Sequence, residues 1–377
     1  MKKINDILKR CNVIETVGSD DRSVAALVFD SRKSEEGAAF FAVRGTQVDG
    51  HDYIAKAVEQ GCKVIVCERL PENINDDVTY YVVDDTAKSL GYAASEFYGR
   101  PSEKLRLVGV TGTNGKTTIA TLLYRLFFNA GYPCGLLSTI ENRINNVVVP
   151  STHTTGDQLQ INEMLSRMVD AGCEYCFMEV SSIGVEQERV TGLKFKAGIF
   201  SNLTHDHLDY HKTFAEYLRC KKLFFDTLPS DAYAITNIDD RNGMVMVQNT
   251  KAEVVTYSVR SIADHTCRVM EQSFEGMLLK TDGVESWSCL IGQHNAYNLL
   301  AIYTTAIVLG ADPEETLVAM STLRPAPGRL ENIRGPKDIS VIIDYAHTPD
   351  ALENVLKTLR EIAPERQLIC LFGCGGD

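Results

Sequence analysis

The amino-acid sequence predicts an α/β protein made of three successive units: a small N-terminal α/β unit, a central unit with a mainly parallel sheet and covering helices, and the start of a Rossmann-like unit. Short apolar runs alternate with segments of helical periodicity, which is typical of such sheets. The 377 residues are enough for about two to three domains of ordinary size. Glycine and proline interrupt the pattern near residue 100. We therefore expect units over 1–100, 101–332 and 333–377.

The N-terminal unit combines strands and a helix. Residues 39–43 and 63–67 are apolar runs of strand length. Between them, residues 53–60 have the spacing of a helix, which Gly61 ends. These elements predict a small α/β unit.

The central unit is richer in buried strands. Its short apolar runs cover residues 105–110, 175–180, 197–200 and 232–236, with helical patterns between several of them. This alternation favours a mainly parallel sheet covered by helices. Residues 264–287 contain shorter alternating segments, which predict an antiparallel edge.

The third unit begins with a strand at residues 340–344. Thr348 is suited to cap a helix with Pro349 at its first position, and residues 367–372 have the composition of another strand. A unit of about forty residues is too short to bury a stable core without help. We therefore expect the sequence to be part of a longer chain.

Composition excludes several classes of function. The formal net charge of −12 argues against a nucleic-acid-binding surface. The first ten residues lack the apolar core of a signal peptide, and the apolar stretch 299–309 is too short to cross a bilayer, so it is interpreted as a buried helix. We predict a cytoplasmic protein that binds neither nucleic acid nor membrane, with a monomer as the default state.

The cysteines fit a reducing compartment, because there are 11 of them without a disulfide framework. Cys173 and Cys176 form a CxxC within an apparent strand, where positions three apart face opposite sides. No second CxxC follows at zinc-ribbon spacing. We interpret both as buried apolar residues, with metal or redox use as the alternative.

The strongest chemical signal is a glycine-rich loop between an apolar strand and a helix. Backbone N–H groups around Gly112 and Gly115 suit phosphate oxygens, Lys116 suits the β- and γ-phosphates, and the Thr117 hydroxyl suits Mg²⁺. The strict pattern GxxxxGK[ST] has glycine where Val110 stands, so the match is a variant. The predicted ATP-binding residues of the loop are Gly112, Thr113, Asn114, Gly115, Lys116, Thr117 and Thr118.

This loop resembles the ATP loop of the Mur ligases and of folylpolyglutamate synthase. Further motifs resemble the Mur ligases, and within them the E type, which adds the third amino acid to UDP-N-acetylmuramoyl-L-alanyl-D-glutamate. These motifs are Asp30–Arg32, Gly45–His51, His153–Thr155, Met178–Ser182, Asn202–His211, Gly292–Asn295, Pro327–Arg329 and Asp344–Pro349. They extend over the whole chain in order, and the ordered set is far more specific than any one motif.

The resemblance implies a fold of three α/β domains and a two-step reaction. ATP phosphorylates the carboxylate at the peptide end, and an incoming amine then attacks the acyl phosphate and expels phosphate. The implied partners are the UDP-N-acetylmuramoyl dipeptide and a diamino acid, either meso-diaminopimelate, which we favour, or L-lysine. Because two anions must meet, cations are needed between them.

Four side chains are the candidate catalytic residues, and three of them are candidate metal ligands with Thr117. Glu179 ends an apolar strand, where a carboxylate suits Mg²⁺, although it could instead cap a helix. The resemblance implies that His207 is a second metal ligand; by itself it would be a solvated histidine. It also implies that Lys221, rather than Lys222, carries a carbamate derived from CO₂. The four candidates are Lys116, Glu179, His207 and Lys221.

The resemblance also implies three sets of binding residues. The first domain would hold uridine diphosphate, and its candidate residues are Ser31, Thr46, Gln47 and Val48. The muramoyl-peptide candidates are Thr154, Thr155, Ser181, Gln187 and Arg189. Without the resemblance, Arg189 would be interpreted as a surface charge. The nucleotide-side candidates are His294, Asn295, Asn298, Arg329, Asp344 and His347.

Two positions depart from the family pattern. Ile183 stands where the family usually has histidine, and Gly156 stands where it usually has proline. Ile183 favours a nucleotide-binding homologue without catalytic activity as one alternative, and the resemblance of the loop to folylpolyglutamate synthase leaves a ligase of that type open as a second alternative.

Overall fold

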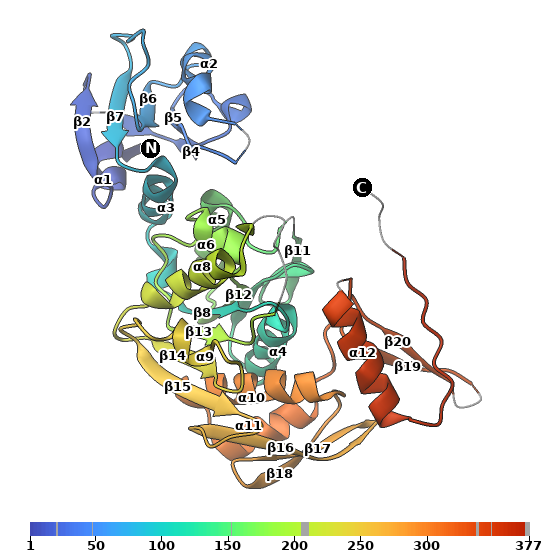
Figure 1. The fold of residues 1–377 in the computed structure, drawn as a ribbon. Coiled ribbons are helices and arrows are strands. Elements are labelled where there is room, and N and C mark those ends of the chain that lie inside the picture. The colour runs from blue at the N-terminus through green and yellow to red at the C-terminus, as the bar shows by residue number, and fades with distance from the viewer. Residues whose placement is uncertain are drawn as a thin grey trace. The chain divides into compact units, whose positions relative to one another are not determined.

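The computed structural model describes residues 1–19, 22–46, 48–151, 153–204, 211–336, 339–347 and 349–373. The chain forms two compact units, and Figure 1 shows the elements of each. Unit 1 consists of Met1–Leu105, Thr155–Ala171 and Ile183–Lys194. Unit 2 consists of Arg106–Thr154, Gly172–Ser182 and Phe195–Asp377.

Unit 1 contains a five-stranded sheet in the order β2-β7-β6-β5-β4, parallel except for the β2–β7 pair. The strands are β2 (Val13–Val17), β4 (Ala26–Val28), β5 (Ala38–Phe41), β6 (Val64–Cys67) and β7 (Thr79–Val83). Its helices are α1 (Ile4–Leu8), α2 (Ile54–Glu59), α3 (Thr86–Phe97) and α5 (Gln158–Asp170), with 3₁₀ turns at Ser31–Lys33, Gly50–Tyr53 and Pro101–Glu103. A two-residue pair, β1 (Lys2–Lys3) with β3 (Ser23–Val24), lies outside this sheet.

Both faces of this sheet are buried, which explains its continuous apolar strands. In β5, Ala39 and Phe41 belong to one apolar cluster, and Ala38 and Phe40 belong to another. The first cluster includes residues of α1 and α3, and the second includes residues of α2. The small N-terminal α/β unit predicted from the sequence is confirmed.

Unit 2 is built on an eleven-stranded sheet in the order β11-β10-β9-β12-β8-β13-β14-β15-β16-β17-β18. Strands from β9 to β16 in this order pair in parallel, and both ends of the sheet are antiparallel. The predicted parallel sheet and the antiparallel edge at residues 264–287 are therefore confirmed. The strands are β8 (Arg106–Thr111), β9 (Cys134–Leu137), β10 (Glu141–Ile144), β11 (Val147–Pro150), β12 (Tyr175–Glu179), β13 (Ala197–Phe200), β14 (Tyr233–Asn237), β15 (Glu253–Ser258), β16 (His265–Ser273), β17 (Gly276–Thr281) and β18 (Val284–Ser288).

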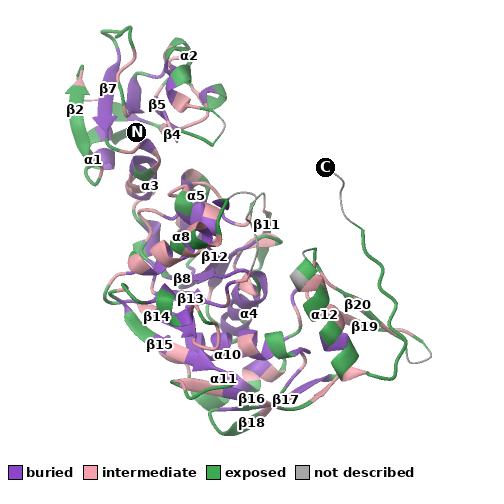
Figure 2. Cartoon of the chain, in the orientation of Figure 1, coloured by how far each residue is buried: buried purple, intermediate pink, exposed green. Residues whose placement is uncertain are grey.

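Helices cover the sheet of unit 2. They are α4 (Lys116–Asn129), α8 (Phe214–Asp226), α9 (Gly243–Met246), α10 (Gln293–Val308) and α11 (Pro313–Ser321). The short α6 (Ser182–Glu186) follows β12 along the chain, and all of it after Ser182 belongs to unit 1. One large apolar cluster joins α4, α10 and α11 to the strands, and Figure 2 shows α4, α10 and the central strands largely as buried. The predicted buried helix at 299–309 is the greater part of α10.

The C-terminal part of unit 2 contains the antiparallel pair β19 (Glu331–Arg334) and β20 (Ser340–Ile343), followed by α12 (Pro349–Ile362). The predicted strand at 340–344 is confirmed, and the helix begins at Pro349 as expected; Thr348 lies outside the described residues. The strand predicted at 367–372 is wrong, because this segment is irregular and Leu371 is 97% exposed. A strand needs a neighbour for its N–H and C=O groups, and no described strand pairs with this segment.

Two further features bear on function. None of the helices in the described ranges combines the length and the apolar character that crossing a membrane requires.

Cys173 and Cys176 are free and buried, and burial raises the pKa of the Cys176 thiol well above its usual value. A protonated thiol is a poor metal ligand, which supports the interpretation of Cys176 as an apolar residue.

Candidate active site

The glycine-rich loop lies between β8 and α4, at the carboxyl end of the central parallel strands. Gly112 has φ +148° and Gly115 has φ +90°, in the region that favours glycine. A Cβ at residue 112 would lie 1.9 Å from Ser201 Oγ, and one at residue 115 would lie 2.4 Å from Asn298 Oδ1. The backbone and the close neighbours therefore both require glycine at these positions.

Replacing Gly115 by alanine is expected to lower the free energy of unfolding through two effects: backbone strain and the collision of the new methyl group with Asn298. Gly131 provides the matched control, since it has φ +93° and no atom within 4 Å of an added Cβ. Strain at such a position costs about 1–3 kcal/mol. Denaturant titration should show the smaller loss for Gly131→Ala, and Mg·ADP binding should weaken only in Gly115→Ala. If both variants lost the same free energy of unfolding, the collision between a Cβ at residue 115 and Asn298 would be contradicted.

The segment after β13 holds the loop in place. The Thr113 N–H donates to Asn202 O at 2.8 Å. The Asn114 N–H donates to Asn202 Oδ1 at 2.9 Å, and the Ser201 hydroxyl donates to Asn114 O at 2.6 Å. The loop is thus fixed by protein contacts on its sheet side.

Lys116 and Thr117 begin α4. Lys116 Nζ donates to Gly112 O at 3.0 Å and to Thr113 O at 2.8 Å, so its ammonium group lies over the loop. The Thr117 hydroxyl donates to Glu179 Oε2 at 3.0 Å, and Arg329 Nη2 donates to Thr117 Oγ1 at 3.3 Å. The chain therefore brings two cations to the start of the same helix.

Glu179 lies at the end of β12, the strand that pairs with β8. Its side chain is buried, and Oε1 also accepts from the Thr139 N–H at 2.7 Å. The alternative role as a helix cap does not describe these contacts, since Glu179 binds a hydroxyl on α4 and a loop N–H. A carboxylate and a hydroxyl 3.0 Å apart are hard oxygen donors of the kind that Mg²⁺ prefers.

The two neighbouring lysines of α8 have different environments. Lys221 is 1% exposed, donates to Gly112 O at 2.8 Å, and lies 4.6 Å from the centroid of the Tyr217 ring. Lys222 instead pairs with Asp226 Oδ1 at 2.6 Å. Of the two lysines, Lys221 therefore contacts the phosphate loop, whereas Lys222 is partly buried in an ion pair within α8.

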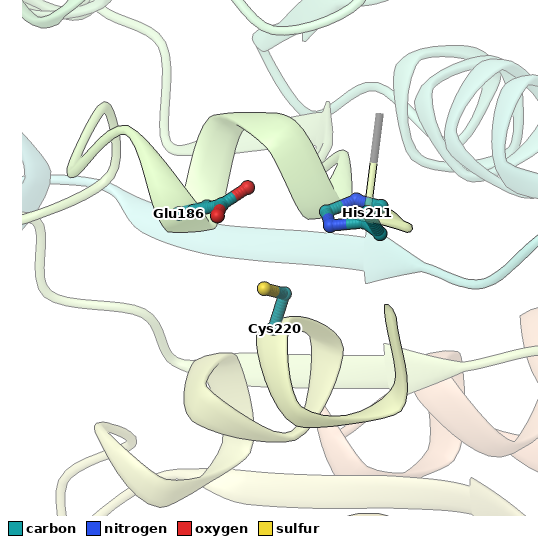
Figure 3. A group of neighbouring side chains, drawn as sticks. All are labelled: Glu186, His211 and Cys220. Carbon is teal, nitrogen blue, oxygen red and sulfur yellow. The ribbon is translucent and has the colours of Figure 1, made fainter. Parts of the chain in front are cut away.

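His207 lies outside the described residues, and its role as a metal ligand stays a prediction. The described chain resumes at His211, whose Nε2 lies 2.8 Å from Ser182 Oγ and whose ring lies 5.2 Å from that of Tyr217. Figure 3 shows His211 and also Cys220 on α8. His211 is buried. The sequence identified it only as the last residue of the motif Asn202–His211, and nothing in its local composition predicted that it would be buried.

The muramoyl-peptide candidates fall in both units, and each unit is described separately. In unit 2, Thr154 Oγ1 accepts from the Thr139 hydroxyl at 3.1 Å, and Ser181 follows β12. In unit 1, Arg189 Nη1 donates to Thr155 O at 2.7 Å and Nη2 donates to Gln187 Oε1 at 2.6 Å. Arg189 is thus partly buried and bonded to two other candidates, so it is not a plain surface charge.

The departures from the family pattern lie close to these residues. Gly156 precedes Asp157, which caps α5 and forms a capping box with Gln160. A Cβ at residue 156 would lie 3.2 Å from Gln160 Oε1. Ile183 lies in α6 directly after Ser182.

The uridine-diphosphate candidates lie in unit 1 near two 3₁₀ turns. Ser31 is buried, whereas Thr46 and Val48 are exposed beside the turn in which the Gly45 N–H donates to Val48 O at 2.9 Å. Gln47 lies outside the described residues. Arg32 makes paired hydrogen bonds to Asp30, and these bonds lower the pKa of Asp30 to about 2.

The Asp30 contribution to stability is expected to disappear in acid. The pKa is depressed in the folded chain, so the stabilisation is complete above the unfolded value of about 3.9 and is lost as pH falls through about 2. The melting temperature of Asp30→Asn should therefore lie below that of the unaltered chain near neutral pH, with a smaller difference at about pH 3. A difference that stays constant with pH would contradict this prediction.

The nucleotide-side candidates lie on α10 and in the segment that follows α11. Asn295 Nδ2 donates to Ile291 O at 2.8 Å, and Asn298 Nδ2 donates to Asn295 Oδ1 at 2.9 Å. Asn295 is therefore held by the backbone, and it in turn fixes the orientation of the Asn298 amide. His294 lies in the first turn of α10 and is exposed. A Cβ at Gly115 would lie 2.4 Å from Asn298 Oδ1, so the structure places Asn298 beside the phosphate loop.

The remaining candidates follow this segment. Asp344 accepts from the Leu330 N–H at 2.8 Å and from the Ala346 N–H at 2.7 Å. The guanidinium of Arg329 lies 5.0 Å from the Tyr345 ring centroid. His347 is exposed, and its Nδ1 lies 2.9 Å from Tyr345 O. Asp344 thus orders the backbone next to Arg329, which reaches Thr117.

Fold and site together define an ATP-using enzyme of the phosphate-loop class. Three family models narrow the class: "Mur ligase family, catalytic domain" matches residues 23–98, "Mur ligase middle domain" matches 110–306, and "Mur ligase, glutamate ligase domain" matches 328–377. The chain belongs to the Mur ligase family and is an ATP-dependent ligase that forms amide bonds.

Individual relatives agree with the family models. A UDP-N-acetylmuramoyl-L-alanyl-D-glutamate–2,6-diaminopimelate ligase of Cytophaga hutchinsonii is 52% identical over 376 residues, covering 100% of this chain and 77% of the relative. The ligase of the same name from Phocaeicola vulgatus is 53% identical, with 100% and 78% covered. A solved structure with this ligase name has a TM-score of 0.84 at 30% identity and covers 100% of this chain and 78% of its own.

More distant structures share the fold alone. The MurF ligase of Thermotoga maritima in complex with ADP has a TM-score of 0.61 at 20% identity, covering 89% of this chain and 74% of its own. A folylpolyglutamate synthase of Mycobacterium tuberculosis, complexed with ADP and AMPPCP, has a TM-score of 0.60 at 18% identity, covering 73% and 71%.

Proposed function

We propose that this protein adds meso-2,6-diaminopimelate to UDP-N-acetylmuramoyl-L-alanyl-D-glutamate during peptidoglycan synthesis, with ATP as the phosphoryl donor. The substrates are those in the names of relatives about 50% identical over the whole chain. The observation that carries the proposal is the arrangement of Thr117, Glu179 and Lys221 around one glycine-rich loop.

Mg²⁺ fits the donors that the site offers. Thr117 and Glu179 provide neighbouring oxygens, and we include His207 and a carbamate on Lys221 as further ligands. Carbamylation joins the lysine nitrogen to CO₂ and releases two protons from the ammonium form, so a cationic side chain would become an anionic oxygen donor. The bound cation supplies positive charge where the terminal phosphate and the acceptor carboxylate approach each other.

The chain's own residues have the complementary tasks. Lys116 is suited to the β- and γ-phosphates, and Arg329 brings a second positive charge beside Thr117. A side chain at Gly112 or Gly115 would collide with Ser201 or Asn298, so glycine permits the loop conformation, and its backbone N–H groups would bind phosphate oxygens. Once the carboxylate is phosphorylated, attack by the amine releases phosphate and forms the amide.

The substrate residues are assigned by the same proposal. Ser31, Thr46, Gln47 and Val48 would bind uridine diphosphate, and the muramoyl-peptide set would bind the sugar and peptide. Asn295, Asn298, His294, Asp344 and His347 would complete the nucleotide site. Arg189 supports this assignment, since its guanidinium already contacts Gln187 and the Thr155 carbonyl and is suited to a carboxylate.

We further propose how the chain is organised and where it works. Residues 1–100 would bind the UDP precursor, 101–332 would bind ATP, and 333–377 would belong to the domain that holds the incoming amino acid. The family models match segments with similar limits. The protein would act in the cytoplasm as a monomer, without nucleic-acid or membrane partners.

Phosphate release by the full-length protein tests the proposal. We expect release from ATP only with UDP-N-acetylmuramoyl-L-alanyl-D-glutamate and meso-diaminopimelate together, and much less with L-lysine as the amine. A pteroyl substrate with glutamate tests the folylpolyglutamate alternative. Turnover with that pair alone would replace the proposal, and nucleotide binding without turnover on any pair would favour the non-catalytic homologue.

A further inference from the structure

The end of β14 and the turn that follows it carry three side chains, Asn237, Asp239 and Asp240, that the reaction described above does not use. They lie next to the segment Ser201–Leu203, because β13 and β14 pair in parallel with Phe200 opposite Thr236. We propose that Asn237 and Asp240 are positioning residues that hold the phosphate loop through this segment, a role that rests on the nucleotide site proposed above.

Asn237 makes the first contact. It is buried, its Nδ2 donates to Ser201 O at 2.8 Å, and its Oδ1 accepts from the Asp239 N–H at 3.0 Å. Both ends of the amide are used, so an aspartate at this position could accept but not donate to Ser201. Asn237 therefore fixes the first residue of the segment.

Asp240 makes the second contact. Its Oδ2 accepts from the Leu203 N–H at 2.7 Å, and its Oδ1 accepts from the Asn242 N–H at 2.8 Å. Hydrogen bonds to a charged carboxylate are stronger than neutral ones. The turn thus holds the segment on both sides of Asn202.

Asn202 and Ser201 use their remaining groups on the phosphate loop. Asn202 Oδ1 accepts from the Asn114 N–H at 2.9 Å, and its Nδ2 donates to Asn114 O at 3.1 Å. Asn202 O accepts from the Thr113 N–H, and the Ser201 hydroxyl donates to Asn114 O. A continuous series of hydrogen bonds therefore runs from the β14 turn to the loop that faces the phosphates.

The neighbouring Asp239 serves a different part of the chain. Its carboxylate accepts from the Ser258 hydroxyl at 2.7 Å, the Val259 N–H at 2.8 Å and the Tyr297 hydroxyl at 3.0 Å. Burial acts to raise the pKa of Asp239, but these hydrogen bonds outweigh it and hold the pKa below its usual value. The loop-positioning role thus belongs to Asn237 and Asp240, which alone among these three contact Ser201–Leu203.

A loop held ready before nucleotide arrives loses less conformational freedom on binding. Small displacements of a positioning residue can change binding and turnover strongly. We therefore expect Asp240→Ala and Asn237→Asp each to weaken Mg·ADP binding by about tenfold, measured by calorimetry on the full chain. In the full-length protein, KM for ATP should rise while KM for the UDP precursor stays unchanged.

Thr236→Val is the matched control. Thr236 lies in β14, and its buried hydroxyl donates to Gly243 O at the start of α9 at 2.8 Å rather than to Ser201–Leu203. This nearly isosteric change should lower the melting temperature but alter Mg·ADP affinity by less than about twofold. Asp240→Asn keeps an acceptor for the Leu203 N–H and leaves its NH₂ group facing the Asn242 N–H, which lies outside the segment, so it should restore part of the affinity lost in Asp240→Ala.

The possible outcomes distinguish the positioning role of Asn237 and Asp240 from the nucleotide site on which it rests. Mg·ADP binding by Asp240→Ala and Asn237→Asp as tight as in the unaltered chain would overturn the positioning role, and so would an equal loss in Thr236→Val. If Asp240→Ala does not fold, the comparison of Asn237→Asp with Thr236→Val decides. Failure of the unaltered chain to bind Mg·ADP would instead overturn the nucleotide site itself.

Discussion

Lys221→Ala is expected to lower kcat of the full-length ligase by about 10²–10³-fold, the usual effect of removing one group that stabilises the transition state. Lys221 is buried, and its Nζ contacts the Gly112 carbonyl of the phosphate loop. Its loss removes both the proposed carbamate ligand and the charge beside the loop. Initial rates of phosphate release at saturating substrates provide the measurement.

Lys222→Ala is the matched control for this prediction. Lys222 is the next residue of the same helix, but its ammonium group pairs with Asp226. Its kcat should stay within about threefold of the unaltered enzyme, because its ammonium group is held by Asp226 within α8 and does not contact the phosphate loop. A kcat equally reduced in both variants would assign the effect to α8 as a whole and contradict a specific role for Lys221.

Glu179→Gln is expected to weaken Mg·ATP binding and to reduce kcat by about 10²-fold. The substitution keeps the size of the side chain but removes its charge. It also leaves an NH₂ group facing either the Thr117 hydroxyl or the Thr139 N–H, both of which donate to Glu179 now. Calorimetric titration with ATP at several Mg²⁺ concentrations should show that the Mg²⁺-dependent part of the affinity is lost.

Glu174→Gln is the control for the second prediction. Glu174 is an exposed acid just before β12, at the other end of the strand that Glu179 ends. Its replacement also removes one negative charge, so it reports any general effect of net charge. Unchanged Mg²⁺ dependence in Glu179→Gln would show that the cation binds elsewhere.

Periodicity predicted most of the fold, because local patterns specify buried strands and helices. The runs 175–180 and 197–200 correspond to β12 and β13 to within a residue. The strand predicted at 367–372 failed for a different reason. An apolar run becomes a strand only beside a partner, and pairing between distant segments is not encoded in local composition.

The site could be predicted only in part. The glycine-rich loop has a local signature, and the structure adds its reason in the close neighbours of Gly112 and Gly115. Composition could not distinguish Lys221 from Lys222, since burial of one lysine depends on how α8 packs. Asn237 and Asp240 carried no signal, because their contacts with Ser201 and Leu203 arise from the pairing of β13 with β14.

The central claim is that one cation joins the start of α4 to the end of β12. Anomalous scattering from Mn²⁺, in crystals of the full-length protein grown with Mn²⁺ and a non-hydrolysable ATP analogue, locates that cation directly. We predict a peak within about 2.0–2.3 Å of Thr117 Oγ1, with Glu179 bound to it directly or through water and the carbamate of Lys221 close by. A peak at the nucleotide that contacts neither Thr117 nor Glu179 would contradict the account.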